Sequence, residues 1–85
     1  MNWVLLVDPA IRKFLKKVPK DQAAKIGAVI DSFISDPYFG DIEKMSNEEN
    51  TWRRRVGSYR IFYKIFPTRN LVFVFKIKRR TLSTY

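Results

Sequence analysis

The segment from Trp52 to Tyr63 reads WRRRVGSYRIFY and predicts more of the fold than any other part of the chain. Its β-branched and aromatic residues flank Gly57-Ser58, a pair that is typical of a two-residue hairpin turn. We therefore expect two strands, Thr51 to Val56 and Tyr59 to Phe66. A third candidate, Leu71 to Lys78, follows four turn-forming residues. The three strands should form an antiparallel meander.

The residues before this meander predict one more strand and two helices. Trp3 to Val7 is a short apolar run that ends at Asp8-Pro9, a pair that can cap a helix and supply its first turn. Apolar residues then recur at three- and four-residue spacing in two stretches, which Pro19 separates. The predicted order is β-α-α-β-β-β. This order indicates an α+β fold in which an antiparallel sheet carries an N-terminal helical hairpin packed on one face.

The chain of 85 residues is short enough that we expect residues 1–85 to form a single domain. Tyr38 to Asn50 shows no sustained periodicity, and we interpret it as a connecting loop with one helical turn at most. Gly27 interrupts the second helical pattern. Either its missing side chain permits a close contact, or it is a tolerated flaw that costs about 1 kcal/mol relative to alanine.

The charge is divided unequally along the sequence. The formal net charge is +9 at pH 7, yet residues 51–85 carry ten Lys or Arg and no Asp or Glu, and all eight acids lie before them. Basic residues interleaved with aromatic ones predict a surface for a polyanion or for an acidic partner. The apolar run at the N-terminus is too short for a membrane span, so we expect a cytoplasmic protein with no membrane partner.

The absence of cysteine and histidine narrows the chemistry that the chain can perform. It excludes thiolate catalysis, zinc fingers and an imidazole acid or base, and we expect neither a metal nor another cofactor. RNA cleavage remains possible without these groups, because RNA supplies its own nucleophile in the 2′-hydroxyl. Arg side chains can stabilise the charged phosphorane. A phenol can act as a base where guanidinium groups lower its pKa, and Tyr85 is the available phenol.

The candidate functional residues follow from strand alternation. Arg53 and Arg55 leave the same face of their strand, and Arg60 opens the next strand just across the turn. Lys78, Arg79 and Arg80 close the last strand. If the register is ordinary, antiparallel pairing brings Arg79 toward Arg60. Guanidinium groups from three strands should then converge in one anion-binding pocket.

Several motifs together resemble the RelE/ParE toxin superfamily. The strand-turn-strand segment quoted above is the most specific of them, and it is accompanied by Asp8-Pro9 before a Lys-rich helix, by Asp36-Pro37, and by the ending Lys78 to Tyr85. The resemblance covers nearly the whole chain. It implies the toxin of a type II toxin-antitoxin system that cuts mRNA on the ribosome, inhibits translation and is neutralised by an acidic cognate antitoxin.

The resemblance also implies roles for individual residues. Arg60 would stabilise the charge of the transition state, Arg79 would act as an electrostatic stabiliser or general acid, and Tyr85 would be the base. Four further basic residues would bind the RNA: Arg53, Arg55, Lys78 and Arg80. Two other functions stay open at this point. They are a ParE-like inhibitor of DNA gyrase, and a basic module that binds RNA or antitoxin without catalysis.

Overall fold

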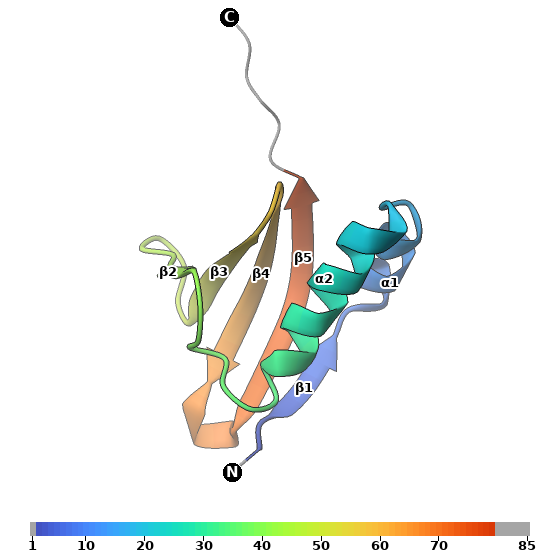
Figure 1. Ribbon diagram of the computed structural model, residues 1–85. Coiled ribbons are helices and arrows are strands. Elements are labelled where there is room, and N and C mark those ends of the chain that lie inside the picture. Colours follow the sequence, from blue (N-terminus) through green and yellow to red (C-terminus); the bar gives the residue numbers. More distant parts are fainter. Residues whose placement is uncertain (1, 80–85) are drawn as a thin grey trace, which may run out of the picture.

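The computed structural model describes residues 2–79 of the chain, which form a five-stranded sheet with two helices on one side (Figure 1). The elements in chain order are β1 (Val4–Val7), α1 (Pro9–Lys16), α2 (Lys20–Ser32), β2 (Ile42–Lys44), β3 (Thr51–Val56), β4 (Tyr59–Phe66), the 3₁₀ turn η1 (Pro67–Arg69) and β5 (Leu71–Arg79). The strands lie in the order β1-β5-β4-β3-β2. The prediction of an α+β fold with a helical hairpin on one face of the sheet is confirmed.

The helix and turn boundaries follow the capping and turn residues that the sequence supplies. The Asp8 carboxylate accepts a hydrogen bond from the Ala10 backbone N–H at 2.9 Å, and Pro9 occupies the first turn of α1. Gly57 adopts φ 57° in the hairpin between β3 and β4, a conformation that glycine adopts at no steric cost. Asn70 ends η1 in the left-handed region, and its side chain donates to the Asn2 carbonyl at 2.6 Å.

The core lies between the helices and one face of the sheet, which we call the covered face. Its fully buried side chains include Phe33 from the end of α2, which stacks on Tyr63 of β4 with ring centroids 4.3 Å apart. The Tyr63 hydroxyl donates to the Pro37 carbonyl at 2.9 Å. These contacts anchor both the helix and the chain that leaves it. The opposite side, which we call the open face, has no helix over it in the described part of the chain (Figure 1).

Two details of the sheet differ from the prediction. β1 pairs with β5 in parallel, so the sheet is mixed rather than wholly antiparallel. In addition, Ile42–Lys44 forms the edge strand β2 within the segment for which the sequence predicts a loop. Three residues are too few to show a period of two, and β2 is a strand because its backbone pairs with β3. Within residues 2–79, neither helix combines the length and the apolar content that a membrane crossing requires.

Candidate nucleic-acid interface

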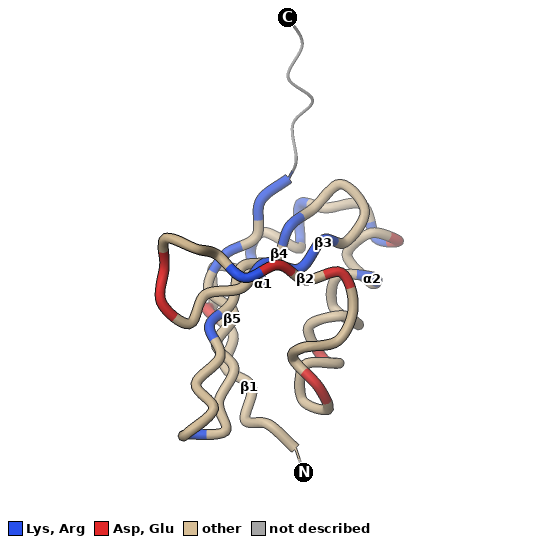
Figure 2. The backbone as a smooth tube through the Cα atoms, turned by 90° about the vertical axis from the view of Figure 1, so that its left-hand side faces the viewer, with Lys and Arg blue, Asp and Glu red and all other residues tan. Residues whose placement is uncertain are grey.

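A row of three cationic residues crosses the open face on three neighbouring strands. Arg55 of β3 pairs directly with Arg60 of β4, and Arg60 pairs with Lys78 of β5. Side chains at directly paired positions leave the same face, with Cβ atoms roughly 5 Å apart. We call these residues the cationic row. Figure 2 shows Lys and Arg gathered at the end of the sheet where β5 ends, whereas the chain around β1 has none.

The burial pattern confirms which residues share this face. In β4 every second residue is buried against the helices, and the alternating set is only half-buried, as expected for a sheet covered on one side. That half-buried set is Arg60, Phe62, Lys64 and Phe66. The prediction that Arg53 and Arg55 lie on the face away from Trp52 and Arg54 is also confirmed by the pairing with β4.

Two acidic residues from the segment around β2 lie beside the cations of β3. Glu43 pairs with Arg53 in the sheet and forms an ion pair with its guanidinium. Asp41 places a carboxylate oxygen 3.8 Å from the Arg55 Nε. These two carboxylates partly neutralise the edge of the interface. The only signal for them in the sequence is the presence of four acids between Tyr38 and Asn50, because the residue pattern does not predict β2.

A β-bulge in β5 decides which basic side chain lies beside Arg60. Phe62 pairs with Lys76 but the next residue, Tyr63, pairs with Val74, so Phe75 is an extra residue on β5. Because Val74 and Ile77 are both buried on the covered face, the two residues between them, Phe75 and Lys76, both belong to the open face.

The expectation that Arg79 approaches Arg60 is therefore wrong. The residue paired with Arg60 is Lys78, and Arg79 pairs with Tyr59, a residue of the covered face. The physical reason is the bulge, since one extra residue moves every later side chain of the strand to the other face. The structure thus brings together Arg55 and Arg60 as predicted, with Arg53 nearby, and it places Lys78 rather than another guanidinium group beside Arg60. It does not add Arg79. Arg80 and Tyr85 lie outside the described residues.

Aromatic side chains continue the open face from the cationic row toward β1. Phe73 and Phe75 of β5 have ring centroids 6.2 Å apart and planes 32° apart. The Lys76 Nζ lies 5.7 Å from the centre of the Phe62 ring, and the Lys64 Nζ lies 5.8 Å from the centre of the Phe75 ring. We call Phe62, Phe73 and Phe75 the aromatic platform. The sequence shows that basic and aromatic residues interleave, but it does not indicate the bulge that brings Phe75 and Lys76 to one face.

The phenol of Tyr63 is not a candidate base. Burial raises its pKa well above the ordinary value, an effect that the nearby Arg54 guanidinium opposes only in part. Arg54 itself lies toward the helices and donates to the Phe39 carbonyl at 2.7 Å. Both side chains belong to the covered side of the sheet and are excluded from the interface.

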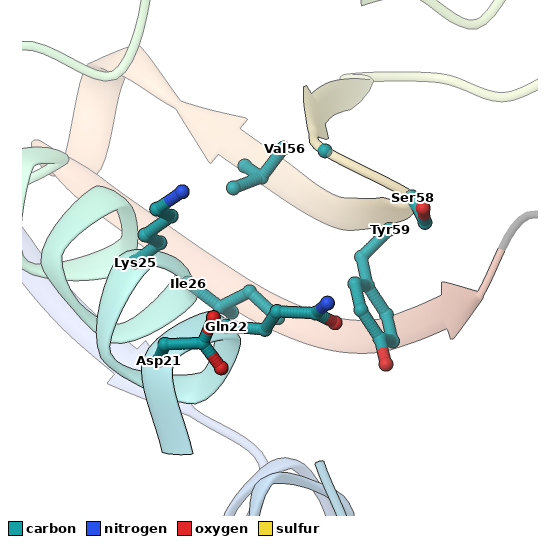
Figure 3. A pocket seen from close by; sticks show the side chains of 8 residues that line it. Asp21, Gln22, Lys25, Ile26, Val56, Ser58 and Tyr59 are labelled. Atoms are coloured by element: carbon teal, nitrogen blue, oxygen red, sulfur yellow. The ribbon is translucent and has the colours of Figure 1, made fainter. Parts of the chain in front are cut away.

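One hollow lies on the covered side, between α2 and the hairpin that joins β3 to β4, with a volume of about 160 Å³. Figure 3 shows Asp21, Gln22 and Lys25 of α2 opposite Val56 and Tyr59 of the hairpin. No motif in the sequence points to this hollow. Its lining mixes one acid, one base, one amide and the hydroxyl residues Ser58 and Tyr59 with apolar groups, so it does not present the concentrated charge of the open face.

Comparison with known proteins gives the fold. No protein-family model matches the chain, and no curated protein sequence matches it. Among solved structures, the chain is similar to a chain of the archaeal RelE-RelB complex from Pyrococcus horikoshii OT3, with a TM-score of 0.83 and 20% identity over 98% of this chain and 100% of that one.

Two further solved structures resemble the chain with similar TM-scores and identities. One is the isolated RelE toxin of E. coli, with a TM-score of 0.78 and 16% identity over 95% of this chain and 87% of that one. The other is a chain of the toxin-antitoxin complex RelBE2 from Mycobacterium tuberculosis, with a TM-score of 0.77 and 19% identity over 94% of this chain and 100% of that one. This chain therefore has the fold of the RelE toxins.

Proposed function

We propose that the protein is the toxin of a type II toxin-antitoxin system and that it cleaves mRNA. The observation that carries this proposal is the cationic row of Arg55, Arg60 and Lys78 on the open face of a RelE-like sheet. Like charges at directly paired positions repel one another, and a bound phosphate relieves that repulsion. Three donors from three strands suit the phosphate of a single RNA strand.

The proposed reaction needs neither a metal nor a histidine. The 2′-hydroxyl of the RNA loses its proton and attacks the adjacent phosphorus, and the bond to the 5′-oxygen of the next nucleotide breaks. A proton then reaches that oxygen, and the upstream product ends in a 2′,3′-cyclic phosphate. Negative charge grows on the phosphoryl oxygens during the attack. Arg60, at the centre of the cationic row, is assigned to stabilise it, and a positioned donor of this kind contributes about 10²- to 10³-fold in rate.

The proton transfers are assigned to the end of the chain. Tyr85 is the proposed base, and Arg79 the proposed general acid or stabiliser, as the resemblance implies. Because Arg79 pairs with Tyr59, its side chain starts on the covered side and has to reach the scissile phosphate around the end of β5. Lys78 leaves the open face directly beside Arg60. Arg53, Arg55, Lys78 and Arg80 are assigned to the RNA backbone.

The proposed partners are mRNA on the ribosome and an acidic antitoxin. Several similar solved structures are complexes of RelE with the antitoxin RelB, which supports a protein partner for this chain as well. An acidic chain can compete with RNA for the cationic row, or it can bind the helical hairpin. Antitoxin affinity that falls steeply with added salt would favour the first surface.

Cleavage of ribosome-bound mRNA tests the proposal. The wild type should cut the message and leave a 2′,3′-cyclic phosphate, and Arg60→Ala should lower the rate about 10²- to 10³-fold. Tyr85→Phe should also abolish most of the activity, since phenylalanine cannot accept the proton. Gyrase-dependent DNA breakage is measured in parallel. Breakage of DNA without cleavage of mRNA would refute the proposal and identify a gyrase inhibitor.

A matched pair of variants tests the assignments at the end of β5. Lys78→Ala and Arg79→Ala remove one cation each at adjacent positions that belong to opposite faces. A larger loss in kcat for Arg79→Ala would support a catalytic role for Arg79. A larger rise in KM for Lys78→Ala would support a role for Lys78 in binding the RNA backbone.

A further inference from the structure

We propose that the aromatic platform of Phe62, Phe73 and Phe75 stacks on the unpaired bases of the RNA that the cationic row holds by its phosphates. This inference rests on the proposed function, because it concerns the same face and the same substrate. It goes beyond that function in assigning how the bases, rather than the phosphates, are bound. The ligand is single-stranded RNA, whose bases are free to stack on protein rings.

The position of the platform follows from the strand register. Phe62 lies two residues after Arg60 on β4, and it is paired with Arg53 on one side and with Lys76 on the other. Phe73 pairs with Lys64 and therefore shares the open face. The three rings of the platform therefore lie within a few residues of the cationic row. An RNA strand whose phosphate binds the row has these rings beside its neighbouring nucleotides. No helix covers these rings in the described part of the chain.

The β-bulge brings a cation to the same face as the rings. In a regular strand Lys76 would lie on the covered face, and only Phe73 and Phe75 would alternate with buried residues. The extra residue instead places Phe75 and Lys76 side by side on the open face. Bulges recur next to functional sites because they redirect a side chain at a local cost in pairing. Here the bulge makes the Phe75 ring and the Lys76 ammonium group neighbours on the open face.

The two lysines beside the rings have a second role in this proposal. Lys76 lies over Phe62, and Lys64 lies over Phe75, at 5.7 and 5.8 Å from the ring centres. A cation over an exposed ring is bound more weakly than a nucleobase stacked on it. The ammonium groups can therefore move to phosphates while bases take their places over the rings.

The distribution of charge favours RNA over a protein partner at this position. Every ring of the platform lies next to Lys64, Lys76 or another ring of the platform, and the cationic row follows directly. The aliphatic part of the open face lies at β1, where Val4 and Leu6 are 54% and 51% exposed, and it borders the platform at Phe73, which pairs with Leu6. An apolar protein segment would be expected along β1 up to Phe73, whereas Phe62 and Phe75, which lie among cations, suit bases among phosphates.

Binding of RNA that cannot be cleaved tests the inference. The probe is a fluorescent single-stranded 2′-O-methyl oligonucleotide, and its partner probe has the same backbone with the bases removed at the central positions. The full-length chain should bind the probe without bases about tenfold more weakly for each base that no longer stacks on the platform. Phe62→Leu and Phe75→Leu should each weaken binding of the complete probe about tenfold, and should not affect binding of the probe without bases.

The salt dependence separates stacking from charge. The slope of log affinity against log salt should be the same for Phe62→Leu as for the wild type, while Lys76→Gln should make it shallower by about 0.7, because one cation fewer binds a phosphate. Phe39→Leu is the matched control, because Phe39 is 68% exposed in the loop before β2 and lies outside the platform. It should leave the affinity unchanged. Circular dichroism confirms that each variant is folded.

Two outcomes would overturn the inference. Equal affinity for the probes with and without bases would show that only phosphates are bound. Unchanged RNA binding in both phenylalanine variants would exclude the platform, and if the same variants weakened binding of the purified antitoxin, the rings would belong to a protein interface. Failure of the proposed function is seen separately, as stacking-dependent binding by a protein that does not cleave mRNA.

Discussion

The two faces of the sheet are built from the same strands but carry different side chains. Along β4 the residues of the covered face are all buried: Tyr59, Ile61, Tyr63 and Ile65. The residues between them, on the open face, are cationic or aromatic and half-buried. One strand thus supplies the core and the interface by alternation alone. Changes to the buried core of the covered face should alter stability without altering RNA chemistry, and changes on the open face should do the reverse.

The strongest test of this separation is Phe33→Ala. Phe33 is fully buried on the covered face and stacks on Tyr63, so the variant should lose about 3–5 kcal/mol of unfolding free energy in urea denaturation. Its RNA cleavage rate per folded molecule should be unchanged. Phe33→Leu, which deletes fewer core atoms and should therefore cost less than the alanine variant, keeps the test valid if Phe33→Ala does not fold. A changed rate in a folded variant would contradict the division between the faces.

Tyr63→Phe tests the covered face again, through the pH dependence of the free energy of unfolding. The hydroxyl bonds to the Pro37 carbonyl, and its removal should cost about 1–2 kcal/mol. Burial raises the Tyr63 pKa in the folded state above its ordinary value near ~10, so the folded protein retains the proton that the unfolded chain releases. The stabilisation is complete below about pH 10 and is lost above it, by about 1.4 kcal/mol per pH unit.

The measurement is the difference in unfolding free energy between wild type and Tyr63→Phe from pH 8 to 11. Subtracting the variant removes the contribution of the other tyrosines and the lysines. The difference should be constant up to about pH 10 and should shrink above it. A difference that grows with pH would mean that the phenolate, rather than the phenol, is stabilised in the folded state.

Glu43→Gln tests the open face with a smaller change. The variant frees Arg53 from its carboxylate partner, so affinity for single-stranded RNA should rise, by up to roughly fivefold at low salt, because an exposed ion pair is worth at most about 1 kcal/mol. The gain should shrink at high salt. Glu48→Gln, which makes the same charge change in the loop after β2, is the control. An equal gain in both variants would indicate a general effect of net charge.

Gly27→Ala should have the smallest effect and separates the two interpretations of this glycine. A Cβ at position 27 would meet no atom within 4 Å, so the structure gives no packing reason for glycine there. The variant should gain about 0.5–1 kcal/mol in unfolding free energy and keep wild-type RNA binding. Thermal denaturation measures the gain. A loss of stability would revive the interpretation that α2 needs a close contact at this residue.

Much of the fold can be predicted because local signals and the global structure agree. The bounds of β3 and β4 match the prediction, and the capping pair Asp8-Pro9 begins α1 as expected. Alternation assigns Arg53, Arg55 and Arg60 to the correct face. The parallel pairing of β1 with β5 could not be predicted, because it joins segments more than sixty residues apart and leaves no local pattern.

The remaining differences between the predicted and the observed structure concern features that the side-chain pattern does not indicate. β2 exists through backbone pairing, and it brings Glu43 to Arg53. The bulge at Phe75 has no glycine or proline to mark it, since the segment FVFKIK reads as an uninterrupted strand. The predicted cluster is therefore correct at Arg53, Arg55 and Arg60, whereas the residue that β5 contributes is Lys78 and not the predicted Arg79, which is one residue away.

The bulge also affects how this chain is compared with its relatives. Upstream of Phe75 the odd-numbered residues of β5 lie on the open face, and downstream the even-numbered ones do. A relative that gains or loses a single residue at this point keeps the strand but exchanges which basic side chain meets the substrate. Ungapped alignment of the last strand would then equate residues from opposite sides of the molecule. Assignments of function at this strand end therefore depend on structural superposition.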